Sequence, residues 1–148
     1  GQWTRPLAKR FESVVCFEPN PNFRECFKKN IHEKNVLLWP YGLSDKRHKA
    51  KQDFNSTVLQ QEDGDIDCRT LDSFGLTNVD FVKIDVDGFE VPLLNGATET
   101  LTKNNPVINI EMKRDKRPGI VAKCESILQD LGYKFENRTK SDEVWLKS

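Results

Sequence analysis

The sequence lacks several features that would each point to a class of protein. Its 148 residues carry 23 basic and 23 acidic side chains, so the formal net charge is zero. Proteins that bind nucleic acid or anionic membranes in general draw their affinity from unbalanced Lys and Arg. Apolar runs are short as well, and none approaches the roughly 20 residues of a membrane-spanning helix. We therefore expect neither a nucleic-acid partner nor a membrane partner.

Cysteine motifs are also missing. The four cysteines are Cys16, Cys26, Cys68 and Cys124, with no C-x-x-C pair and no histidine at ligand spacing. This spacing excludes a zinc site and a thioredoxin-like redox motif. We expect reduced thiols and a cytoplasmic protein, and we assign no metal-binding residues.

What is present fits one globular domain over residues 1–148. A chain of this length buries on the order of 70% of the surface that its unfolded form exposes. Nine Phe and three Trp supply bulky apolar side chains for a core, which argues against intrinsic disorder. The domain therefore needs neither disulfide bonds nor a structural metal to fold.

Short apolar runs, typical of buried strands, alternate with segments of helical periodicity. Residues 44–67 are polar and weakly patterned, and we expect a loop there with one hairpin. Strands are predicted at 13–17, 35–39, 79–86, 106–112, 133–136 and 143–147. Helices are predicted at 22–32 and 121–131, with a helical stretch after D-G-F-E that ends near residues 95–96 and a further helix that runs to about residue 103. This order predicts an α/β fold with a doubly wound, mostly parallel sheet and an antiparallel C-terminal hairpin.

In such sheets ligands bind beyond the carboxyl ends of the strands. Glu18 follows the first predicted strand, where an acidic side chain can accept hydrogen bonds from the ribose hydroxyls of a nucleotide. A solvated glutamate at a strand end is an equally good interpretation. The pattern alone leaves both open.

A second group of carboxylates follows the strand at 79–86. Asp85, Asp87 and Glu90 crowd within six residues, which is costly unless a helix N-terminus, Lys83, a cationic ligand or a divalent metal offsets their charge. Helix capping by Asp87 is the structural alternative. Glu111 ends the next strand and should face the same crevice.

Two basic runs, at 46–51 and 113–117, flank that crevice. A run of like charges is usually a solvated surface, although two of them on one rim would also attract an anionic substrate.

Several motifs together resemble the FkbM family of S-adenosylmethionine-dependent methyltransferases. They span nearly the whole chain in the family's order, and the D-x-x-G-x-E block with its upstream T-L-D is specific. The motifs are F-E-P-N-P at 17–21, K-K-N-I at 28–31, G-L-S-D at 42–45, T-L-D at 70–72, V-D-F-V-K-I-D-V-D-G-F-E at 79–90, L-L-N-G-A at 93–97 and P-V-I-N-I-E at 106–111.

The resemblance implies a seven-stranded, Rossmann-like class I methyltransferase sheet and an S-adenosylmethionine cofactor. It places Glu18 on the ribose and Asp85 near the methionine end of the cofactor. The cofactor-binding residues that it implies are Gly1, Glu18, Pro19, Asn20, Gly42, Leu43, Ser44 and Asp85. A divalent metal would be compatible with the carboxylates, but no residue pattern supports one.

The chain departs from the family at its start and at Asp87, where the family commonly has Glu. Family members begin with a strand that ends in a glycine-rich turn, and only Gly1 matches the last glycine of that turn. We therefore expect an N-terminally incomplete domain that lacks the first, central strand. Unpaired inner edges would favour oligomers formed through the exposed edges of the sheet.

The resulting prediction is a methyltransferase that methylates an oxygen of a small-molecule or glycan-like acceptor. Asp85, Glu90 and Glu111 are the predicted catalytic residues, because a carboxylate can take the hydroxyl proton of the acceptor. The alternative is a non-catalytic or degenerate Rossmann-like binding module. A nicotinamide-dependent oxidoreductase would share Glu18, but the sequence offers no residues for hydride transfer.

Overall fold

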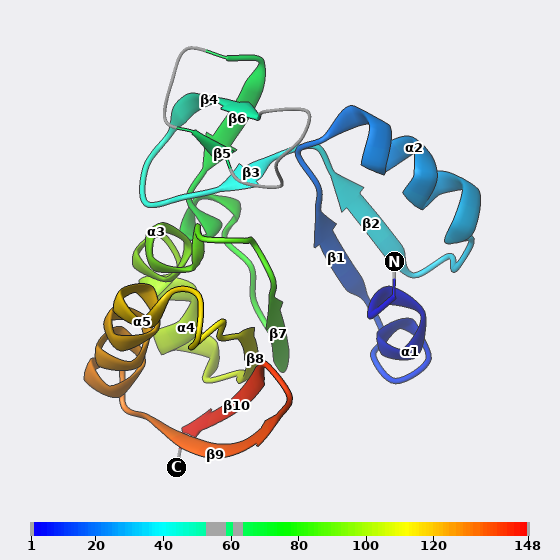
Figure 1. The fold of residues 1–148 in the computed structure, drawn as a ribbon. Helices are drawn as coiled ribbons and strands as arrows, with labels where there is room; N and C mark the ends of the chain where they lie inside the picture. Colours follow the sequence, from blue (N-terminus) through cyan, green and yellow to red (C-terminus); the bar gives the residue numbers. More distant parts are fainter. Residues whose placement is uncertain (1, 53–58, 61–63, 148) are drawn as a thin grey trace.

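The structure, a computed structural model, describes residues 2–52, 59–60 and 64–147. Its strands form one two-stranded sheet and two four-stranded sheets (Figure 1). The predicted α/β fold is confirmed. The predicted seven-stranded, mostly parallel sheet does not appear as one sheet in the described residues. Their strands form three separate sheets, and two of these contain both parallel and antiparallel pairs.

The two-stranded sheet follows the predicted pattern closely. A short helix, α1 (Thr4–Ala8), leads into β1 (Val14–Phe17), which pairs in parallel with β2 (Val36–Trp39). The helix between them is α2 (Pro21–Asn30). At its start, Oδ1 of Asn20 accepts hydrogen bonds from the backbone N–H groups of Asn22 and Phe23, at 2.9 and 3.3 Å. An Asn cap followed by Pro is a strong helix start.

The C-terminal half of the chain builds a mixed sheet in the order β7-β8-β10-β9. β7 pairs in parallel with β8, and the last two strands form the predicted antiparallel hairpin. The strands are β7 (Phe81–Ile84), β8 (Val107–Glu111), β9 (Tyr133–Thr139) and β10 (Asp142–Lys147).

The region predicted to be a loop contains a third sheet. Its strands are β3 (Gly42–Leu43), β4 (His48–Gln52), β5 (Leu59–Gln60) and β6 (Ile66–Arg69). β4 pairs antiparallel with both β5 and β6, so the expected hairpin is part of a larger sheet, and residues 53–58 and 61–63 lie outside the described residues. The hydrophobic pattern of the sequence does not indicate β4, because its one apolar residue is the small, buried Ala50 and its neighbours are basic or polar.

The main core lies between the β7-β8-β10-β9 sheet and three helices, which lie together on one side of that sheet (Figure 1). These helices are α3 (Glu90–Asn95), α4 (Thr98–Asn104) and α5 (Pro118–Asp130). Ile84, Ile108 and Ile110 from β7 and β8 are almost completely buried against them. No helix in the described part of the chain is long and apolar enough to cross a membrane.

One carboxylate is buried completely inside this half of the molecule. Glu143 on β10 accepts hydrogen bonds from Nε of Arg114 at 2.7 Å and from Nε of Arg138 at 2.9 Å. Buried charges of this kind persist only when they are paired. Arg138 on β9 therefore ties the two strands of the hairpin together, and Arg114 holds the hairpin to the loop that follows β8.

The T-L-D and L-L-N-G-A motifs meet at the start of α4. Asp72, in the short 3-10 helix η1 (Leu71–Phe74), accepts hydrogen bonds from the backbone N–H of Glu99 at 3.0 Å and of Thr100 at 2.7 Å. Gly96 packs so closely on the backbone of Ser44 that an added Cβ would lie 2.0 Å from the Ser44 carbonyl oxygen. These motifs therefore lock η1, α4 and β3 together.

β1 and β7 both border one cavity of about 780 Å³. Within the described residues, β1 pairs only with β2, and β7 pairs only with β8, so each strand turns its other edge toward this cavity (Figure 1). Contacts across the cavity include the stacked rings of Phe11 and Phe81, whose centroids are 6.0 Å apart. The cavity lies at the junction of two sheets, a common location for ligand sites.

Candidate functional site

The carboxylates at the strand ends are brought together by the sheet register. Ile84 pairs with Ile110 in the parallel ladder, so Asp85 and Glu111, the next residues on the two strands, lie side by side. Asp142, the first residue of β10, pairs with Glu111 across the antiparallel ladder. Three carboxylates from three neighbouring strands therefore meet at one end of the sheet.

Two lysines compensate for this negative charge. Lys83 on β7, whose side chain is 10% exposed, places its ammonium nitrogen 2.5 Å from Oδ1 of Asp142. Lys113 pairs with Asp87 and lies 2.9 Å from Oε2 of Glu111. Among the described residues, no cluster of His, Cys, Asp or Glu has the arrangement of a metal site.

The proton affinities of Asp85 and Glu111 shift in opposite directions. Partial loss of solvation raises the pKa of Asp85, and the negative charge of Glu111 raises it further, although Asp85 is an exposed residue. Burial also opposes ionisation of Glu111, but the hydrogen-bonded ammonium of Lys113 outweighs it and lowers the pKa of Glu111. The two carboxyl groups share a hydrogen bond that favours a proton on Asp85.

Glu90 has different surroundings. Its side chain is 4% exposed, and its Oε1 accepts a hydrogen bond of 3.0 Å from the N–H of Gly88. Burial, followed by the charges of Glu90 and Glu125, raises the pKa of Cys124 on α5 to about 12. Glu90 therefore stabilises the turn and lies near α5, and its predicted catalytic role stays a prediction.

Glu18 lies at the carboxyl end of β1 and lines the 780 Å³ cavity. Its Oε1 accepts a hydrogen bond of 2.9 Å from the N–H of Asn20, and burial raises its pKa. Arg24 donates to the carbonyl oxygens of Glu18 and Pro19, at 3.1 and 2.6 Å, and so fixes the turn. A carboxylate offers about four acceptor positions, so Glu18 retains the capacity to bind a ligand diol.

The cavity brings together three of the predicted site residues, which are Glu18, Leu43 and Asp85. The other predicted site residues within the described part of the chain do not line it. Pro19 and Asn20 shape the turn after β1, Gly42 belongs to β3, and Ser44 is fully buried with its N–H donating to the carbonyl oxygen of Arg69 at 2.9 Å. Gly1 lies outside the described residues.

Lys113 and Trp3 are site residues that the sequence did not single out. The indole ring of Trp3 lines the cavity, with the ammonium of Lys83 5.0 Å from its centroid. Lys113 was seen only as part of a basic run. Its position two residues after Glu111 was the available signal, because alternate residues of an extended chain point to the same side.

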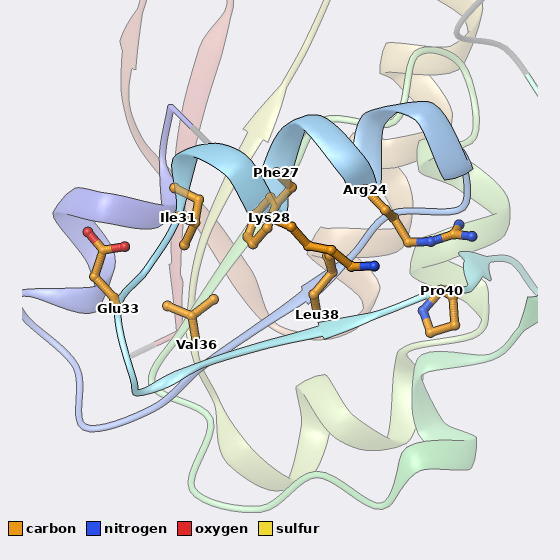
Figure 2. Close-up of a pocket in the computed structure, with 8 residues that line it drawn as sticks. All are labelled: Arg24, Phe27, Lys28, Ile31, Glu33, Val36, Leu38 and Pro40. Carbon is orange, nitrogen blue, oxygen red and sulfur yellow. The ribbon is translucent and has the colours of Figure 1, made fainter.

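A second pocket, of about 400 Å³, lies between α2 and β2. Figure 2 shows Glu33 at one end of it and Arg24 at the other, with Phe27, Leu38 and Val36 between them. It contains none of the predicted site residues. The two basic side chains that line it also have partners: Lys28 pairs with Glu25 at 3.0 Å, and Arg24 donates hydrogen bonds to backbone carbonyl oxygens.

Comparison with known proteins gives the family. A family model described as the methyltransferase FkbM domain matches residues 4–135. The crystal structure of methyltransferase FkbM from Methylobacillus flagellatus KT is similar, with a TM-score of 0.66 and 18% sequence identity. The similarity covers 99% of this chain and 40% of that one, so this chain spans less than half of that protein's length. A search of curated proteins gave no match.

At 18% identity, the solved structure supports the likeness of fold alone. The family model covers most of the chain, including Glu18, Asp85 and Glu111 but not Asp142. On that basis, the chain belongs to the FkbM methyltransferase family.

Proposed function

We propose that this domain uses S-adenosylmethionine to methylate an oxygen of a small-molecule or glycan-like acceptor. The observation that carries the proposal is that Glu18 and Asp85, from the ends of strands in two different sheets, line one cavity. Family membership supplies the class of reaction.

The residues present suit the chemistry of this cofactor. A ribose diol donates two hydrogen bonds, and the half-buried carboxylate of Glu18 is an acceptor already oriented by Asn20. The cationic amino group of the methionine end suits the acidic environment around Asp85. When bound, the cofactor supplies an electrophilic methyl group next to these side chains.

Asp85 is the residue that we propose to take the proton of the acceptor hydroxyl. Its raised pKa gives it a higher proton affinity than an ordinary aspartate, which suits general-base catalysis nearer to neutral pH. Glu111 holds Asp85 by a hydrogen bond, and Ser141 in turn donates to Oε1 of Glu111 at 3.3 Å. The chain thus offers an oriented base at the rim of the cavity.

Calorimetric titration with S-adenosylhomocysteine tests cofactor binding. Glu18→Ala should weaken binding by about 2–4 kcal/mol, because two hydrogen bonds to a charged acceptor are lost. Glu12→Ala is the matched control, since Glu12 lines the same cavity before β1, at the opposite end of that strand from Glu18. Equal affinity of the wild type and Glu18→Ala would remove Glu18 from the site.

Turnover is tested with methyl-labelled S-adenosylmethionine and a panel of hydroxylated small molecules and methyl glycosides. Transfer of label to a hydroxyl oxygen would support the proposal. Tight binding of S-adenosylhomocysteine with no transfer to any acceptor would favour a binding module.

A further inference from the structure

Lys113 occupies a particular place in the carboxylate cluster. It lies two residues beyond the end of β8, on the loop that leads to α5. Its ammonium group pairs with Asp87, on the turn after β7, and with Glu111, at the end of β8. One cation therefore joins two carboxylates that come from different strand ends and that both neighbour Asp85.

We propose that Lys113 is a positioning residue that bridges Asp87 and Glu111, holds both carboxylates in place against Asp85, and thereby sets the charge that Asp85 meets. The inference rests on the proposed function only where it treats Asp85 as the proton acceptor. The charge coupling itself is a property of the unliganded chain.

The balance of charge makes Lys113 the decisive group. Four carboxylates meet here, those of Asp85, Asp87, Glu111 and Asp142, and two ammonium groups, those of Lys83 and Lys113, face them. Lys83 is engaged with Asp142 at 2.5 Å. Without Lys113, the cluster would hold three more negative than positive charges when fully ionised, instead of two.

Four other groups of the described residues surround the pair. Arg117 places its guanidinium against Gly88, in the turn that carries Asp87, where an added Cβ would lie 3.0 Å from a guanidinium nitrogen. Ser141, which precedes β10, donates a hydrogen bond to Glu111 but carries no charge. Glu90, behind the turn, is buried and negative when ionised. Lys83 lowers the pKa of Asp85, but burial and the charge of Glu111 outweigh it.

The opposite shifts of the two carboxyl groups agree with this geometry. Hydrogen bonding to Lys113 lowers the pKa of Glu111 against the effect of burial, and the same contacts, first with Asp87 and then with Glu111, raise the pKa of Lys113. An ionised Glu111 in turn raises the pKa of Asp85. A purely structural role for Lys113 would connect the turn after β7 to β8 but would not affect which of Asp85 and Glu111 loses its proton first.

The test is a pH titration of the carboxyl carbons by ¹³C NMR, using the 148-residue chain labelled at Asp and Glu. Asp85→Asn and Glu111→Gln assign the two resonances. In Lys113→Met, the Glu111 midpoint should move up by about 1 pH unit or more, because an opposite charge at contact distance is lost, and the Asp85 midpoint should move down, because Glu111 then stays protonated over more of the titration. Lys113→Arg should restore the midpoints to near those of the wild type.

Lys103→Met is the matched control, because Lys103 pairs with Glu99 on the exposed surface of α4. It should leave both midpoints unchanged. Unchanged midpoints in Lys113→Met would overturn the inference. If that variant does not fold, Glu111→Gln decides the question, since loss of the like charge must lower the Asp85 midpoint, and an unaltered midpoint would overturn the coupling.

Calorimetry with S-adenosylhomocysteine on the same proteins separates this inference from the proposed function. Shifted midpoints support the role of Lys113 whether or not the nucleoside binds. Absence of binding to the wild type counts against the proposed function alone.

Discussion

Removing the carboxylate of Asp72 should destabilise the fold by about 2–3 kcal/mol. Asp72 accepts one hydrogen bond from the N–H of Glu99 and another, of 2.7 Å, from the N–H of Thr100. The N-cap residue of α4 is Ala97, which makes no side-chain cap bond, so Asp72 supplies the cap from η1. Asp72→Ala would thus uncap α4 and remove two of the bonds that tie it to η1, while the hydrogen bond from the Asp72 N–H to the carbonyl oxygen of Gly96 would remain.

The magnitude follows from the surroundings of the two amides. Thr100 is 4% exposed, so its N–H would lose its partner with little access to water, which costs about 1–3 kcal/mol. Glu99 is exposed, and water can replace the carboxylate there, so the loss is about 0.5–1 kcal/mol. Asp72→Asn keeps one acceptor oxygen and should cost about half as much as Asp72→Ala.

Urea unfolding followed by circular dichroism measures the effect, provided that the slope with denaturant is the same for each variant. Asp115→Ala is the control, because this exposed aspartate lies in a surface turn, where a substitution should change stability by less than about 0.5 kcal/mol. If Asp72→Ala lies within that margin of the wild type, the two hydrogen bonds do not hold α4.

Three further predictions follow from other parts of the structure. Asp85→Asn should lower turnover by roughly 10²-fold. The wild-type rate should fall when the pH drops below the raised pKa of Asp85, because the base must be ionised to accept a proton. A variant with normal turnover would assign proton transfer to another group. Glu143→Gln should cost about 1–3 kcal/mol in thermal or urea unfolding, because two charged hydrogen bonds weaken, while both arginines stay partly exposed and Arg114 keeps Glu125. With a thiol reagent near neutral pH, exposed Cys26 should react fast and Cys124 only after unfolding, because Cys124 is fully buried and burial raises its pKa to about 12.

The parts of the fold that could be predicted are those in which apolar residues run without interruption. β1 and β2 are such runs, β7 and β8 are mostly apolar strands interrupted by Lys83 and by Asn109, and all four lie within the predicted ranges. The pairing of Asp85 with Glu111 was also foreseeable, because neighbouring parallel strands place their carboxyl ends at one edge.

The rest depends on contacts that sequence patterns do not encode. β4 carries one small buried residue, Ala50, so hydrophobic periodicity could not show it. The basic run that contains Lys113 predicted a charged rim, but the pairing with Asp87 depends on how the loop after β8 returns toward the turn after β7. The crowding of Glu90 with Asp85 and Asp87 in the sequence does not show that the hydrogen bond from Gly88 holds Glu90 in a buried position.

The small sheet of β1 and β2 has a dynamic consequence. An isolated pair of strands is marginally stable, and this one meets the rest of the chain through side-chain contacts such as Phe17 with Phe74, whose ring centroids are 5.0 Å apart. We expect its amides to exchange with solvent deuterium through a local opening of lower free energy than global unfolding. A ligand held by Glu18 and Asp85 would span both parts and slow that exchange, so occupancy of the cavity should be measurable as protection of β1 and β2.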